Sequence, residues 1–327
     1  MTINRRSLLT GLAAAPAATL ISGQAGASTA TAPTGLPPAL HQFSLGQAKV
    51  TVLLDGHLPL GMQLFADFDA DKAAAALATG LHQLTAEGVN IPVNGYLVEQ
   101  GASKILIDAG TADLLGPNLG AFGAGLAATG VKPEEISTVL LTHMHPDHSG
   151  GLVAADGSAV FPNAELVVSK VEWDFWHDDA IMASVPENSR GFFQMARGTV
   201  APYANRLKLF EGEAPVAAGF TALPLPGHTP GHSGFMLDGG DQQLLFWGDV
   251  IHSTALQFAY PDWTIAFDTD APLTVETRYK MLDRAVADNL LLTGSHIDFP
   301  GLGRVQRQGD AYGYQPAPWQ FGLSSGG

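Results

Sequence analysis

The sequence predicts an α/β fold in which two β-sheets pack face to face and helices flank them. Strand-like apolar runs come first along the chain, and helix-like segments lie between and after them, which is the pattern of sheets covered by helices. Four apolar runs end in residue types that bind metal ions, which indicates a site on loops above a β-scaffold. The chain has 327 residues, of which 46% are hydrophobic, so it can bury a substantial core.

The individual elements follow from local patterns. Residues 48–54 alternate as a strand does, and Asp55-Gly56 is expected to end that strand in a turn. Residues 94–98 and 104–108 are expected to form a hairpin. The clearest helix is predicted at 272–288, where apolar residues recur at near-helical spacing. Further helices are expected at residues 73–79, 119–128 and 171–176, and a turn at residues 131–135.

The most informative segment holds three imidazoles and one carboxylate within six residues: His143, His145, Asp147 and His148. It directly follows the apolar run 138–141, which reads as a short buried strand. Imidazole together with carboxylate suits zinc and similar metals. On a loop, residues i and i+2 can face one way while i+4 and i+5 turn elsewhere. The first two histidines can therefore hold one metal ion, and the Asp-His pair a second one close by.

Three later segments repeat this arrangement. His228 lies in a Gly/Pro-rich turn after an apolar run, Asp249 follows the run 244–247, and His296 follows the run 290–292. A metal site built on loops above a sheet requires ligand-type residues at several strand ends. Together the four segments predict one shared centre.

In order and in spacing, these segments resemble the metallo-β-lactamase superfamily, and more closely its branch with methyl parathion hydrolase and dihydrocoumarin-lactonase-like relatives. The resemblance covers roughly residues 43 to 314 and includes shorter motifs, among them Gly116-Pro117-Asn118-Leu119-Gly120 and Phe299-Pro300-Gly301-Leu302-Gly303. It implies an αββα sandwich that forms a single hydrolase domain over residues 43–327.

The resemblance implies a centre of two divalent metal ions. Zinc is the expected metal, and cobalt, manganese or iron would accept the same ligands. Seven residues are expected to hold the ions in two groups that share one carboxylate: His143, His145 and His228 for the first ion, Asp147, His148 and His296 for the second, and Asp249 between the two.

Such a centre needs no side-chain nucleophile. Two dications lower the pKa of a bridging water from about 16 towards neutrality, so hydroxide is the expected nucleophile. Asp147 and Asp249 are the expected catalytic carboxylates. Asp108 and His232 are expected to hold the metal-binding imidazoles in place through hydrogen bonds.

The pocket beside the metals decides the substrate. By resemblance its mouth is lined by Leu115, Trp176, Phe192, Phe193, His252, Ile265 and Phe267. An aromatic and aliphatic pocket favours a hydrophobic leaving group. The organophosphate-degrading members carry an aliphatic residue at the position of His252, whereas His252 and Phe267 resemble the lactonase-type relatives. The sequence thus predicts hydrolysis of lactones or aryl esters with phosphotriesters as a side activity, and a dedicated phosphotriester hydrolase is the alternative.

Three other functions share parts of the motif. The bridging carboxylate of Asp249 argues against a β-lactamase. A di-iron oxygen reductase would require Glu at the position of His145. A non-catalytic periplasmic zinc-binding protein predicts a closed ligand shell without an apolar mouth. Turnover of an aryl ester distinguishes an enzyme from such a zinc buffer, whereas metal content does not.

Charge and composition limit the partners. The formal net charge of −15 argues against nucleic acid and against an anionic membrane surface. The expected partner is a small hydrophobic ester, lactone or phosphotriester, and the sequence leaves a homodimer open. The chain has no Cys, so it has neither disulfides nor thiolate ligands.

The N-terminal segment predicts export. Arg5-Arg6 resembles a twin-arginine motif, an apolar stretch from Leu12 to Ile21 follows, and Ala25-Gly26-Ala27 is a small-x-small cleavage signal. Residues 1–27 are therefore expected to be an export signal to the periplasm, and residues 28–42 a flexible mature N-terminus. An ordinary secretory signal or an uncleaved anchor stays open.

N-terminal sequencing of periplasmic material tests this expectation. The mature chain should begin near Ser28, because cleavage follows the small residue of the Ala25-Gly26-Ala27 signal. An intact Met1 in a membrane fraction would indicate an anchor instead.

Overall fold

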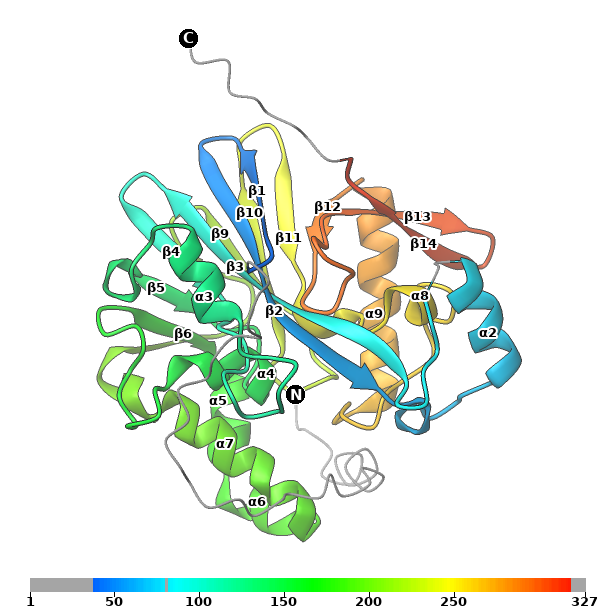
Figure 1. The fold of residues 1–327 in the computed structure, drawn as a ribbon, viewed down its shortest axis with the longest axis horizontal. Coiled ribbons are helices and arrows are strands. Elements are labelled where there is room, and N and C mark those ends of the chain that lie inside the picture. Colours follow the sequence, from blue (N-terminus) through cyan, green and yellow to red (C-terminus); the bar gives the residue numbers. More distant parts are fainter. Residues whose placement is uncertain (1–37, 80–81, 319–327) are drawn as a thin grey trace.

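The computed structural model describes residues 38–79 and 82–318, which form the expected αββα sandwich (Figure 1). Each sheet has seven strands, in the order β1-β2-β3-β4-β5-β6-β7 and β14-β13-β12-β11-β10-β9-β8. The strands of the first sheet are β1 (Leu40–Leu45), β2 (Ala48–Leu60), β3 (Val89–Gln100), β4 (Ser103–Ile107), β5 (Thr138–Leu140), β6 (Glu165–Ser169) and β7 (Leu207–Phe210). Those of the second are β8 (Ala214–Ala217), β9 (Phe220–Pro224), β10 (Ser233–Asp238), β11 (Gln243–Phe246), β12 (Leu291–Thr293), β13 (Gly303–Gln308) and β14 (Ala311–Pro316).

Helices cover the outer faces of both sheets (Figure 1). The α-helices are α2 (Ala70–Thr79), α3 (Phe122–Ala128), α4 (Pro146–Ser149), α5 (Lys170–His177), α6 (Asp179–Ser184), α7 (Arg190–Val200), α8 (Thr254–Gln257) and α9 (Ala271–Ala287). Short 3-10 turns are η2 (Met62–Leu64), η3 (Pro133–Glu135), η4 (Gly150–Leu152), η5 (Glu187–Ser189), η6 (Ala201–Arg206) and η7 (Gly248–Val250). None of the helices in the described ranges is long and apolar enough to span a membrane.

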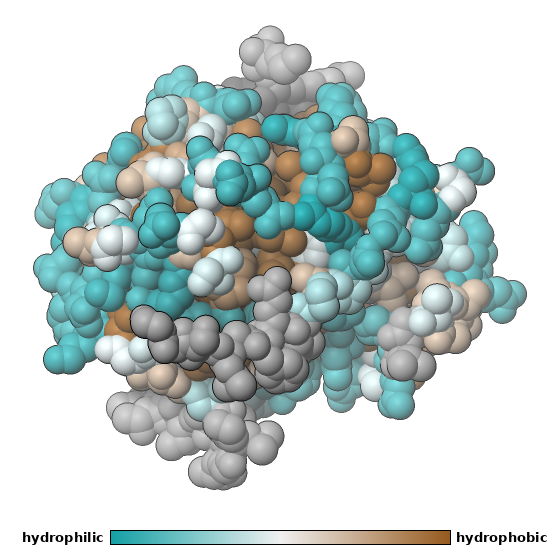
Figure 2. All heavy atoms as spheres, turned by 90° about the horizontal axis from the view of Figure 1, so that it is seen from above, coloured by the Kyte–Doolittle hydropathy of each residue, from teal (hydrophilic) through white to brown (hydrophobic). Residues whose placement is uncertain are grey.

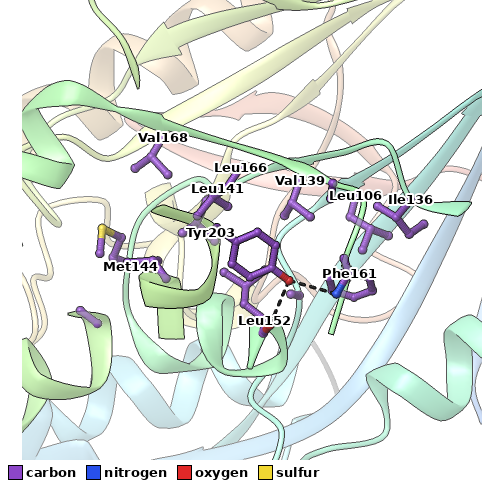
Figure 3. Packing of buried hydrophobic residues seen from close by; sticks show 14 of the residues in the cluster. Leu106, Ile136, Val139, Leu141, Met144, Leu152, Phe161, Leu166, Val168 and Tyr203 are labelled. Atoms are coloured by element: carbon purple, nitrogen blue, oxygen red, sulfur yellow. Dashed lines mark hydrogen bonds between the residues drawn. The ribbon is translucent and has the colours of Figure 1, made fainter. Parts of the chain in front are cut away.

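The layers are held by three apolar cores. Between the sheets, residues such as Val52, Ile105 and Phe246 pack against one another. Outside the first sheet, side chains of α3, α5 and α7 pack on its strands, and α9 packs in the same way on the second sheet. In the first of these outer cores, the buried Tyr203 hydroxyl donates to Leu152 O at 2.9 Å and accepts from Phe161 N at 3.1 Å (Figure 3). Figure 2 shows a face on which hydrophilic side chains surround a central hydrophobic area.

Strand direction explains where the site forms. Strands β4 to β7 are mutually parallel, as are β11 and β12. Parallel strands end at the same edge of a sheet, and ligands bind in the loops beyond those carboxyl ends. The two sheets therefore present the loops after β4, β5, β11 and β12 to one common region.

Most predicted elements are confirmed, and two boundaries were wrong. The hairpin of β3 and β4, the helices at α2, α5 and α9, and the 3-10 turn η3 lie where the sequence placed them. Strand β2, however, does not end at Asp55 but continues to Leu60 with an irregular register at that point. The reason is that Asp55 turns inward and accepts from Thr111 N at 3.0 Å and Phe122 N at 2.8 Å. Helix α3 begins at Phe122 rather than residue 119, after Gly120 with a φ of 95°.

The predicted export signal lies outside the described residues, as do residues 28–37 of the predicted mature N-terminus.

Candidate metal centre

The first sheet supplies four of the candidate ligands. Strand β5 ends at Leu140, and the loop after it carries His143 and His145. His145 is the N-cap of the short helix α4, which carries Asp147 and His148. Pro146 at the start of this helix fits, because its fixed φ is preorganised for a first helical turn.

The second sheet supplies the other three. His228 follows β9, Asp249 lies in η7 directly after β11, and His296 follows β12. Gly248 precedes Asp249 with a φ of 58°, and a Cβ there would lie 2.5 Å from His232 Nε2. Glycine is thus required for the turn that points Asp249 inward.

Four of the candidate histidines meet around one carboxylate oxygen. Asp249 Oδ2 lies 3.6 Å from His143 Nε2 and 3.4 Å from His228 Nε2. It also lies 3.3 Å from His148 Nε2 and 3.2 Å from His296 Nε2. A carboxylate between both halves of the cluster can contact two ions at once.

Two sets of three donors lie on either side of Asp249. The first histidine triad is His143, His145 and His228, and the second ligand group is Asp147, His148 and His296. In each set the ligand-type atoms all lie within 4.8 Å of one another. Within the triad, His145 Nδ1 is 3.0 Å from His143 Nε2 and 2.9 Å from His228 Nε2.

The charge of these groups suits cations. Burial lowers the pKa of His143 and His145 well below the ordinary imidazole value, so both rings are neutral and offer lone pairs. At His148 the carboxylates of Asp249, Asp147 and Asp108 outweigh burial and hold the pKa well above its ordinary value, so this side of the cluster favours a positive charge, and a metal ion would have to displace the proton of that ring. Two polar atoms of the cluster, His148 Nε2 and Asp249 Oδ1, are buried without a hydrogen-bond partner. Converging lone pairs and carboxylates of this kind support binding of divalent metal ions.

Three of the histidines are held through their other ring nitrogen. Asp108 Oδ2 lies 2.9 Å from His148 Nδ1, and its carboxylate also accepts from Thr142 N and Oγ1. Asp268 Oδ1 lies 2.9 Å from His228 Nδ1. His296 Nδ1 donates to the carbonyl of Pro92 at 2.8 Å. Such contacts fix the ring orientation and the tautomer.

His232 holds Asp249 rather than a histidine. Its Nδ1 donates to Leu225 O at 2.8 Å, and its Nε2 accepts from Asp249 N at 3.0 Å. Burial lowers the pKa of His232 to about 3, which keeps the ring neutral and Nε2 free to accept. The sequence predicted that His232 holds a metal-binding imidazole, whereas its ring nitrogens contact Leu225 O and Asp249 N.

A family model described as the metallo-beta-lactamase superfamily matches residues 89–298, which contain every ligand-type residue of the cluster. The chain belongs to this superfamily. Among solved structures, the hydrolase AbOPH of the β-lactamase superfamily is 33% identical with a TM-score of 0.81, over 86% of this chain and 98% of that chain. AidC, a dizinc quorum-quenching lactonase, is 26% identical with a TM-score of 0.79, over 87% of this chain and 99% of its own.

The similarity to sequences with a described activity is more limited. An N-acyl homoserine lactonase of Bacillus cereus is 27% identical over 169 residues, which cover 46% of this chain and 60% of that lactonase. The chain therefore spans less than two thirds of the length of this relative.

An aromatic pocket borders the first histidine triad. It is lined by His145, Phe175, Trp176, Ser189, Phe192, Phe193, Ala266, Phe267 and Thr269. The ring centroid of His145 lies 5.5 Å from Trp176 and 6.3 Å from Phe192, both edge to face. The free space between these side chains is only about 20 Å³, and Phe175, Trp176 and Phe193 are buried while Phe192 and Phe267 are partly exposed. A hydrophobic substrate group would therefore contact mainly Phe192 and Phe267, next to the metal centre.

The structure places the predicted pocket residues in four locations. Trp176, Phe192, Phe193 and Phe267 line the aromatic pocket. Ile265 does not line it, because its side chain is buried in the apolar cluster around Trp263 and Phe65. Leu115 is half-buried on the loop before α3 and also lies outside the lining.

His252 lies within the metal-ligand cluster rather than at its mouth. Its Nε2 is 3.3 Å from Asp249 Oδ2, and its ring stacks on His296 with centroids 5.2 Å apart. With His228 and Asp249 it forms a further group of closely spaced ligand-type atoms. Gln257 fixes its backbone, because Gln257 Oε1 accepts from His252 N at 2.6 Å. Burial lowers the pKa of His252 to about 4.

Sequence reasoning missed Asp268 and Glu172. Asp268 carries no motif, and only its position beside Phe267 connects it to the site. Glu172 lies four residues before Trp176 in α5, and the sequence offers no reason for a buried carboxylate there. Its contacts are described below.

Asp268→Asn should weaken metal binding by on the order of 10- to 100-fold, the usual loss when a hydrogen bond to a metal-binding histidine is removed. The Asp268 carboxylate accepts from Ile265 N as well as holding His228, and an amide cannot accept with both of its heavy atoms. Competition with a chelator measures the loss. The exposed Asp238→Asn is the matched control, and equal affinity in both variants would contradict the role given to Asp268.

Proposed function

We propose that the protein is a metal-dependent hydrolase that opens lactones or cleaves aryl esters at a centre of two divalent ions, with zinc as the metal. The observation that carries the proposal is the convergence of imidazole nitrogens on Asp249 Oδ2, between the first histidine triad and the second ligand group. A buried donor set of this kind beside an aromatic pocket fits a hydrolytic centre better than a storage site.

Relatives of two kinds support the choice of substrate. The similar structure AidC is a dizinc lactonase, and the similar curated sequences include N-acyl homoserine lactonases. Lactones and aryl esters share a planar carbonyl joined to an oxygen leaving group. The partly exposed ring of Phe192, beside His145, suits the apolar part of such a molecule.

Different residues of the chain would bind the two ions and the substrate. The first histidine triad would hold one ion, the second ligand group the other, and Asp249 would contact both. When bound, two divalent ions supply an acidified water and polarise the scissile carbonyl. The aromatic pocket binds the hydrophobic group and excludes water from one side of the site. Asp147, whose side chain is 12% exposed, is the carboxylate of the cluster that solvent reaches most easily.

His252 contributes to substrate choice in this proposal. Its ring lies beside Asp249 and His296, so it can donate a hydrogen bond to a lactone oxygen that approaches the two ions.

Periplasmic export of the folded, metal-loaded chain through residues 1–27 is also part of the proposal, because metal binding accompanies folding.

A substrate panel tests the function. The metal-loaded protein is assayed with lactones, aryl esters, phosphotriesters and β-lactams under identical conditions. The proposal expects the highest kcat/KM on a lactone or aryl ester, and weaker turnover of phosphotriesters. Preferred turnover of a β-lactam, or turnover of none of the four classes, would rule it out.

Asp249→Ala and His228→Ala should each abolish hydrolysis. Asp249 lies between both ligand groups, so its loss disrupts the centre as a whole, while loss of His228 removes one third of the first histidine triad. Rates and metal content are measured on the same preparations. Wild-type rates in either variant with metal still bound would exclude the two-metal mechanism.

His252→Leu should lower lactonase activity and raise phosphotriesterase activity, with unchanged metal content. The polar ring can bond to a lactone oxygen but crowds a bulky tetrahedral phosphotriester. Each effect should be about 1–3 kcal/mol in transition-state stabilisation, the scale of one reshaped pocket contact. Loss of one metal equivalent would instead identify His252 as a ligand. A parallel loss of both activities with metals intact would make it general catalytic machinery.

A further inference from the structure

Glu172 is a fully buried acidic residue beside the metal centre, with 0% of its surface exposed. Among the residues that the structure describes, no Lys or Arg forms an ion pair with it. A carboxylate in such a place is costly unless hydrogen-bond donors surround it. Burial raises the pKa of Glu172, and its donors act in the opposite direction.

Four donors satisfy both oxygens of this carboxylate. Oε1 accepts from Met144 N at 2.9 Å and from Trp176 Nε1 at 2.6 Å. Oε2 accepts from Thr229 Oγ1 at 2.6 Å and from Gly231 N at 3.0 Å. The donors belong to three segments: the loop after β5, helix α5, and the turn after β9.

Two of these segments deliver the first histidine triad. Met144 lies between His143 and His145, and Thr229 directly follows His228. A single carboxylate therefore connects the loop after β5, in the first sheet, to the turn after β9, in the second sheet. The distance between the two loops sets the distance between the triad's nitrogens.

The third segment is the wall of the aromatic pocket. The Trp176 indole donates to Glu172 with its Nε1–H and presents its ring edge-on to His145. Close packing makes the arrangement specific, because a Cβ on Gly231 would lie 2.1 Å from Glu172 N. Only glycine at that position lets the His228 turn approach the start of α5.

We propose that Glu172 is a positioning residue that fixes the first histidine triad relative to the wall of the aromatic pocket. It touches neither substrate nor metal. Through Met144 and Thr229 it sets the spacing of the triad, and through Trp176 it sets where the hydrophobic group of the substrate lies. The catalytic part of this inference rests on the proposed function, whereas its metal-binding part does not.

Glu172→Gln is the sharpest test. If the amide oxygen takes the Oε1 position, the hydrogen bonds from Met144 N and Trp176 Nε1 remain. The amide NH2 then faces the N–H of Gly231, and two donors cannot bond to each other. The substitution therefore loosens mainly the His228 turn. Co²⁺ affinity, measured by chelator competition, should fall on the order of 10- to 100-fold, as for other residues that orient metal ligands. The visible absorption of the Co²⁺ protein should change with it, and kcat should fall more than KM rises.

One variant controls for simple loss of stability, and a second repeats the test. Tyr203→Phe removes a hydroxyl that makes two buried hydrogen bonds in the core outside the first sheet (Figure 3). It should lower the urea midpoint but leave Co²⁺ affinity and spectrum as in the wild type. Thr229→Val removes one of the four donors and should weaken Co²⁺ binding in the same direction, by less than Glu172→Gln.

The inference fails if Glu172→Gln and Thr229→Val both keep the Co²⁺ affinity and spectrum of the wild type while their urea midpoints fall as in Tyr203→Phe. That result would show that Glu172 serves folding alone. If Glu172→Gln does not fold, Thr229→Val decides by the same measurement. If the wild type hydrolyses nothing in the substrate panel, the proposed function fails, yet the Co²⁺ comparison still decides the role of Glu172.

Discussion

The structure of the site depends on one constraint: five imidazole nitrogens are held within 3.6 Å of a single carboxylate oxygen, Asp249 Oδ2. Lone pairs turned towards each other repel, and burial is unfavourable for a carboxylate. Three of the rings are fixed from behind, those of His148 and His228 by a carboxylate and that of His296 by a carbonyl. The rest of the fold, from the parallel strand ends to the glycine turn before Asp249, serves to hold these groups together against their repulsion.

The two halves of the cluster lie in different surroundings. The second ligand group has carboxylates on several sides, and they hold the pKa of His148 well above its ordinary value against the effect of burial. The first histidine triad instead adjoins aromatic rings, through the contact of His145 with Trp176 and Phe192. An ester that spans both halves would therefore meet a charged side and an apolar side. This asymmetry orients a substrate before any specific hydrogen bond forms.

The sequence predicted the two-sheet sandwich and the residues that meet at the candidate metal centre, because ligand-type residues at the ends of apolar runs are local features. It failed where the deciding contacts are long-range. Asp55 reads as a turn residue, yet it is buried because it binds Thr111 and Phe122, far along the chain. Glu172 and Asp268 each make one short-range hydrogen bond, to Trp176 and Ile265. Their remaining partners lie 28 to 59 residues away for Glu172 and 40 residues away for Asp268, and no local pattern encodes them. His252 could be placed near the metals, but its position inside the cluster follows from Gln257 and the loop before Trp263.

The distribution of ligands over both sheets has a consequence for the lifetime of the protein. An ion bound to donors from the loop after β5 and from the loops after β9, β11 and β12 joins the two layers, and it cannot bind the unfolded chain in the same way. By mass action such an ion adds to the free energy of unfolding, by about 4 kcal/mol when its free concentration is a thousand times its dissociation constant. Resistance to proteolysis would then follow the metal supply of the compartment, so that scarcity of the ion removes the protein as well as its activity.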